Sequence, residues 1–114
     1  MNKLSNLKTS IRLSIVNPDS EVSSVFGKGI ADLCRGVSEL GSLNAAAKSM
    51  GMAYSKAWRI IKDTEKSLDI ELLIRDGAHG SELTQDGLKL LSIYDTISKK
   101  SSEEALKLYK KECE

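Results

Sequence analysis

The sequence predicts a single domain that is mainly α-helical with a small β component. Apolar residues recur every three or four positions over most of the chain, glycines stand where these runs end, and two short stretches have strand-like patterns. A chain of 114 residues can bury a modest core without metal ions or disulfides. Only 4% of the residues are aromatic, so we expect a core of aliphatic side chains.

The N-terminal strand region, residues 1–26, is predicted to begin with a loose polar stretch over Met1–Leu7. Apolar and polar side chains alternate between Thr9 and Val16, and this two-residue period is typical of a half-buried strand. Asn17–Ser20 contains the only proline and reads as a turn. Val22–Phe26 is a second short extended piece that could pair back with the first in a hairpin.

Three helices are predicted next. Lys28–Leu40 has one apolar face and is followed by Gly41, which suits a left-handed C-cap. Leu43–Met50 contains three consecutive alanines, which allow a close helix crossing, and either Ser42 or Asn44 is its N-cap. The apolar face of the first helix is formed by Ile30, Leu33, Cys34, Val37 and Leu40.

Gly51 is suited to a tight turn into the third helix, Tyr54–Leu68. At about 100° per residue, one line of this helix faces the core and the opposite side is polar. Ala53 cannot cap this helix with its side chain, so either the N-cap is missing or Ser55 takes over as a helix start one turn later. The core line consists of Ala57, Ile61, Thr64 and Leu68, flanked by Ile60 and Tyr54.

The chain then predicts a β-ribbon and a long helix. Ile70–Arg75 and Glu82–Thr84 read as strands around a glycine-bearing turn, and Thr84 is a good N-cap for a helix over residues 85–114. Ser101 and Glu104 fit a capping box, so this helix could break and restart there. Residues 28–84 therefore predict a winged helix-turn-helix, with residues 85–114 as a dimerisation helix.

Charge is segregated around the predicted turn, although the net charge is only +1. Between Ser42 and Lys62 every charged residue is a cation, and acids follow directly after Lys62. A local cation-rich face can bind DNA in a nearly neutral protein. The cations are Lys48, Lys56, Arg59 and Lys62, and the acids are Asp63, Glu65, Asp69 and Glu71, which look like solvated charge.

We expect ten residues to contact DNA. Arg59 is the first candidate, because a long planar cation can reach base edges or bridge two phosphates. The alternative interpretation is that Arg59 lies on a solvated helix face that contacts no DNA. Ser55 and Lys56 lie in the first turns, which usually touch bases, and Tyr54 could do so or flank the core. Lys62 is expected to contact a DNA phosphate and not a base. The remaining candidates are Ser42, Asn44 and Lys48 for phosphates that set the register, Arg75 at the foot of the wing, and His79 at its tip.

Other kinds of site find little support. Trp58 is expected to pack at the edge of the core, and Cys34 to be a small buried thiol. Two cysteines and a single histidine do not form a metal cluster or a catalytic pair, so we expect no enzyme, cofactor or metal. The sequence contains neither a signal-peptide pattern nor a membrane span, so we expect a cytoplasmic protein that does not bind membranes.

The order of motifs resembles the N-terminal DNA-binding domain of ModE-type molybdate-responsive regulators and, more loosely, the LysR-type winged helix. The resemblance covers roughly residues 9–94 and implies a dimeric regulator whose third helix and wing contact operator DNA. The motifs are Gly41-Ser42-Leu43-Asn44-Ala45-Ala46-Ala47, Gly51-Met52, Ala57-Trp58, Leu73-Ile74-Arg75 and Leu83-Thr84; Ala57-Trp58, the preceding strand and Phe26-Gly27-Lys28-Gly29 favour the ModE type.

The function predicted is therefore a DNA-binding transcriptional regulator that acts without a molybdate-sensing domain. We expect a homodimer on double-stranded DNA with a short inverted repeat, paired through the N-terminal strand, the long helix or both, and a separate effector protein is a candidate partner. One alternative is a winged helix used for protein–protein contact without DNA. A molybdate sensor is a second alternative, although the sequence shows no pattern that indicates an oxyanion-binding pocket.

Overall fold

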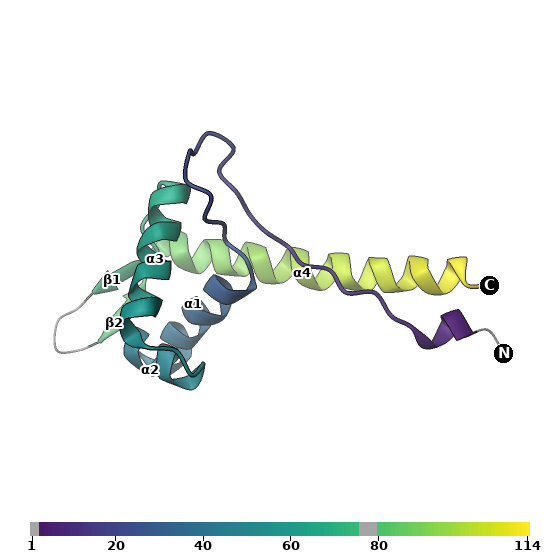
Figure 1. Ribbon diagram of the computed structural model, residues 1–114, viewed down its shortest axis with the longest axis horizontal. Coiled ribbons are helices and arrows are strands. Elements are labelled where there is room, and N and C mark those ends of the chain that lie inside the picture. Colours follow the sequence, from purple (N-terminus) through teal and green to yellow (C-terminus); the bar gives the residue numbers. More distant parts are fainter. Residues whose placement is uncertain (1–2, 76–79) are drawn as a thin grey trace.

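The computed structural model describes residues 3–75 and 80–114. Within these residues the chain forms a short 3-10 helix, four α-helices and a two-stranded antiparallel ribbon (Figure 1). Helices α1, α2 and α3 and the ribbon gather at one end of the molecule, and α4 runs away from them. The elements are η1 (Lys3–Asn6), α1 (Lys28–Leu40), α2 (Leu43–Ser49), α3 (Tyr54–Leu68), β1 (Leu73–Arg75), β2 (Ser81–Leu83) and α4 (Gln85–Glu112). This is the mainly helical, winged helix-turn-helix fold that the sequence predicts.

The helix ends follow the predicted caps. Gly41 has a φ of 86° and Gly51 a φ of 66°, the left-handed region that favours glycine. The hydroxyl of Ser42 accepts a hydrogen bond from Ala45 N at 3.0 Å, and that of Thr84 accepts one from Gly87 N at 2.9 Å. The predicted bounds of α1 and α3 are therefore confirmed, and α2 ends one residue earlier than predicted.

The core is mainly aliphatic, with Phe26 and Tyr94 as its aromatic members, and lies where α1, α2 and α3 meet the ribbon and the start of α4. Gly36 on α1 lies so close to α2 that an added Cβ would come within 2.7 Å of Ala46 Cβ. The close crossing expected from the alanines is thus made with α1. The largest fully buried side chains include Phe26, Leu33, Leu43, Ile61 and Leu72.

The N-terminal prediction needs correction. The region from Thr9 to Val16 is extended but forms no strand, and only Ile15 makes a bridge, with Phe26, through two hydrogen bonds of 2.9 Å. Leu13 and Ile15 pack against the core, whereas Ile11 is 47% exposed. The hairpin is limited to one pair because α1 begins at Lys28, so the returning chain leaves the strand direction.

The predicted break in the last helix is wrong. Helix α4 runs without interruption, and the Ser101 hydroxyl donates to the Ile97 carbonyl at 2.5 Å instead of capping a new helix. A serine inside a helix can satisfy its hydroxyl in this way without ending the helix. The buried residues of α4 are Gly87, Leu91 and Tyr94, so its second half extends beyond the core. Of the helices in the described ranges, none combines the length and apolar character that crossing a bilayer requires.

Candidate nucleic-acid interface

Helix α3 separates a core face from an exposed face, as its sequence predicts. Ala57 and Ile61 are fully buried, and Thr64 donates its hydroxyl to the Ile60 carbonyl at 2.8 Å. Ser55, Lys56 and Arg59 are exposed on the other side. Ala53 provides no side-chain cap, as expected. The first two turns of α3 thus present two long cations and a hydroxyl to solvent.

An aromatic pair lies beside this face. The rings of Tyr54 and Trp58 stack with centroids 6.5 Å apart, and both residues pack partly against the core. Trp58 is therefore at the edge of the core, as predicted. Lys62 Nζ lies 4.4 Å from the Trp58 ring centroid and 3.1 Å from Glu65 Oε1. Lys62 is thus engaged within the protein by both contacts.

The candidate residues of α2 lie at both ends of that helix. Asn44 and Lys48 are exposed, while Ser42 is half-buried. The Ser42 oxygen accepts the capping hydrogen bond, so its O–H remains able to donate to an anion.

The ribbon is tied to the corner between α1 and α2. Ser81 N donates to the Gly41 carbonyl at 3.2 Å, and β1 pairs with β2 in the register Leu73 with Leu83 and Arg75 with Ser81. The backbone of Arg75 thus ends β1, as expected for the foot of the wing. The Arg75 side chain and the whole of His79 lie outside the described residues.

A buried carboxylate joins α3 to the ribbon, and sequence reasoning missed it. Glu65 was expected to be solvated, but it is only 9% exposed. Its Oε2 accepts hydrogen bonds from Leu72 N at 2.7 Å and Leu73 N at 3.3 Å. On a helical projection Glu65 lies about 40° from Ile61, on the core side of the helix. This position could have predicted that Glu65 is buried.

Ser67, also missed, anchors the N-terminal region to α3. It is 1% exposed, and its hydroxyl lies 3.1 Å from the Val22 carbonyl oxygen and 2.5 Å from that of Ser24. This buried hydroxyl gives the returning chain before α1 a hydrogen-bonded contact with α3.

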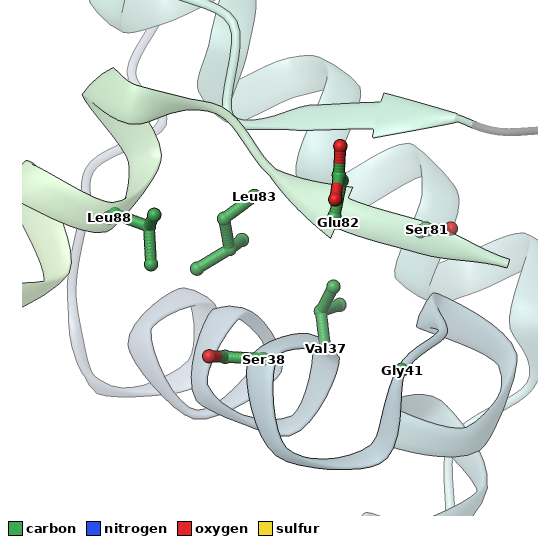
Figure 2. Close-up of a pocket in the computed structure, with 7 residues that line it drawn as sticks. All are labelled: Val37, Ser38, Gly41, Ser81, Glu82, Leu83 and Leu88. Atoms are coloured by element: carbon green, nitrogen blue, oxygen red, sulfur yellow. The ribbon is translucent and has the colours of Figure 1, made fainter.

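The hollow shown in Figure 2 is separate from this face. It has a volume of about 370 Å³, and α1, β2 and the start of α4 form its walls. Val37, Leu83 and Leu88 point toward one another, while the Glu82 side chain points toward β1 (Figure 2). None of its lining residues comes from α2 or α3, so it belongs to the packing of the wing against α1 and α4.

Two crossed helices, an exposed cationic helix face and an attached ribbon define a winged helix-turn-helix. Residues 33–88 match the family model described as bacterial regulatory helix-turn-helix protein, lysR family. A solved structure described as the crystal structure of the CbnR_DBD–DNA complex is 27% identical with a TM-score of 0.56, over 65% of this chain and 84% of that chain. The comparison with curated sequences gave no match.

Residues 33–88 are thus similar to the LysR-type helix-turn-helix, which is a regulatory, non-enzymatic domain. Of the two resemblances seen in the sequence, the comparisons support the LysR type. The narrower ModE-type assignment stays a prediction.

Proposed function

We propose that this protein is a transcriptional regulator that binds double-stranded DNA as a homodimer. The observation that carries the proposal is the exposed face of α3, where Ser55, Lys56 and Arg59 stand on a rigid helix within an acid-free segment. The LysR-type match of residues 33–88 and the similarity to a DNA-binding domain solved with DNA support the same function.

In this proposal α3 enters the major groove. Arg59 contacts base edges or bridges two phosphates at the centre of the contact. Ser55 and Lys56 reach base edges from the first turn. Ser42, Asn44 and Lys48 donate to phosphates and set the register. Lys62 has to leave Glu65 and Trp58 to reach a phosphate, so we assign it a smaller share. Tyr54, Arg75 and His79 complete the proposed surface.

A dimer is expected on energetic grounds. One protomer makes few phosphate contacts, and the affinity that such contacts provide falls steeply as the salt concentration rises. A monomer would therefore bind DNA weakly at physiological salt. Two copies of α3 about 34–36 Å apart would read the two halves of a short inverted repeat. Control by a separate effector protein, and kinship with ModE-type regulators, belong to the same proposal.

The test compares Arg59→Ala with Lys99→Ala, which removes an exposed charge from the far part of α4. Fluorescence anisotropy with a labelled 30-base-pair duplex of random sequence at about 50 mM salt measures binding, and thermal melting checks the fold. We expect Arg59→Ala to weaken binding about tenfold or more at an unchanged melting temperature, and Lys99→Ala to bind like the wild type.

Unchanged affinity in Arg59→Ala would refute the role of that residue. If the wild type binds no duplex even at low salt, the DNA-binding function fails, and a winged helix for protein–protein contact becomes the better account. Titration of the protein with molybdate tests the sensor alternative.

A further inference from the structure

Residues 8–14 have the sequence pattern of a strand but no partner strand. Apolar and polar residues alternate from Ser10 onward, and the segment contains no helix or turn and is drawn out in Figure 1. Within the described parts of the chain, no backbone hydrogen bond joins residues 8–14 to another segment. Extended chain with unpaired N–H and C=O groups is a template for pairing with another strand.

This segment is held at both ends. On one side Ile15 forms its bridge with Phe26, and on the other the Tyr109 hydroxyl donates to the Leu4 carbonyl at 2.7 Å. Between these anchors the chain crosses α4 in the view of Figure 1. Because the anchors already restrict the segment, ordering it against a partner costs less conformational entropy than ordering a loose tail.

Both the segment and α4 expose apolar side chains. Leu7 is 58% exposed and Ile11 is 47% exposed. Three exposed apolar residues of α4 fall within about 60° of one another on a helical projection and so form one stripe, whereas Leu88 lies on another side of the helix. The stripe consists of Ile93, Ile97 and Leu108.

The whole chain also exposes more surface than a compact monomer. Its accessible area is 8025 Å², whereas a folded monomer of 12.5 kDa is expected to expose about 6,200 Å². Its radius of gyration is 17.0 Å, against about 13 Å for a compact domain of this length. The excess is well above the roughly 800 Å² that each partner buries in a standard interface.

We propose that residues 8–14 pair as an antiparallel strand with the same residues of a second copy of this chain. The inference rests on the proposed homodimer and names the surface that forms it. A symmetric dimer needs one patch that is complementary to itself, and an open strand edge and an apolar stripe meet that need. The strand that the sequence predicts is then completed between protomers.

The existing bridge indicates the register. Ile15 directs its N–H and C=O toward Phe26, so in an extended chain Ser10 and Arg12 direct theirs to the opposite, open edge. Centring the two-fold axis on Ile11 pairs Ser10 with Arg12 of the partner subunit and places the two Ile11 side chains in contact. Centring it on Arg12 would set two like charges directly opposite, which is unfavourable.

Cysteine cross-linking tests this register in the full chain. The background is Cys113→Ser, because Cys113 is half-exposed, whereas Cys34 is buried. Ile11→Cys places two thiols in a non-hydrogen-bonded pair about 4.5 Å apart at Cα, within reach of a disulfide. Ser14→Cys is the matched exposed control, since its two copies would lie about 20 Å apart.

We expect mild oxidation to convert most of Ile11→Cys into a covalent dimer and to leave Ser14→Cys monomeric on a non-reducing gel. Ser10→Pro should raise the dimer dissociation constant about tenfold or more in sedimentation equilibrium, because it deletes two intermolecular hydrogen bonds and none within a protomer. Thr9→Pro, whose N–H faces the other edge, should dimerise like the wild type.

Equal cross-linking of both cysteine variants, or of neither, overturns the strand pairing. A wild-type dimer that binds duplex but lacks the Ile11→Cys disulfide overturns this inference and leaves the proposed regulator standing. A monomeric wild type overturns the pairing and the proposed homodimer together.

Discussion

Replacing Glu65 with alanine should destabilise the junction between the recognition helix and the wing. The carboxylate accepts hydrogen bonds from Leu72 N and Leu73 N, so Glu65→Ala leaves two buried N–H groups unpaired. Each costs about 1–3 kcal/mol, while the half-exposed ion pair with Lys62 adds less than about 1 kcal/mol. We expect a loss of about 2–7 kcal/mol, a large part of the roughly 5–15 kcal/mol that holds a domain together.

Urea unfolding followed by circular dichroism measures this loss. Glu65→Gln keeps an oxygen to accept the backbone hydrogen bonds and should lose only about 1 kcal/mol. Glu71→Ala removes an exposed glutamate six residues along the chain and should change stability by less than about 0.5 kcal/mol. If Glu65→Ala lies within about 1 kcal/mol of the wild type, or Glu65→Gln is equally damaging, the carboxylate does not anchor the wing.

Three further outcomes are expected. Gly36→Ala should lose about 1–2 kcal/mol of unfolding free energy, because its Cβ meets Ala46, while Gly29→Ala, with open space, should gain up to about 1 kcal/mol. Burial raises the pKa of the Cys34 thiol from 9.0 to about 12, so the unfolded chain ionises first. The contribution of Cys34 to stability should therefore be constant below pH 9 and fall by about 1.4 kcal/mol per pH unit above it, and the difference in urea stability between the wild type and Cys34→Ala should follow this change. For Arg59→Ala, a salt titration of duplex binding should show a shallower slope by about one unit if Arg59 meets a phosphate, and a steeper or equal slope would contradict that contact.

The helix-turn-helix could be predicted because its signals are local. Amphipathic faces place α1 and α3, and the caps at Ser42 and Thr84 use side chains that bond within three residues. Left-handed glycines end α1 and turn the chain after α2. The exposed face of α3 follows from the same periodicity, so the positions of Ser55, Lys56 and Arg59 could be predicted, although their contacts with DNA stay predictions.

Two of the errors share a physical cause, since each depends on what a distant part of the chain does. The strand near Ile11 fails because α1 begins too soon to pair with it. The carboxylate of Glu65 is buried because Leu72, just before β1, and Leu73, its first residue, bring two backbone N–H groups to it. The third error is local, because Ser101 bonds to a carbonyl four residues earlier in its own helix, so α4 continues.

The sequence by itself determined the elements, their order and the cation-rich face of α3, because periodicity, capping and charge are properties of neighbouring residues. Only the tertiary structure decided that Gly36 leaves room for Ala46, that Glu65 ties α3 to the wing, and that residues 8–14 form no backbone hydrogen bond with another described segment. Such contacts join segments distant in sequence, and their energies depend on burial and approach distance, which appear only once the chain has folded.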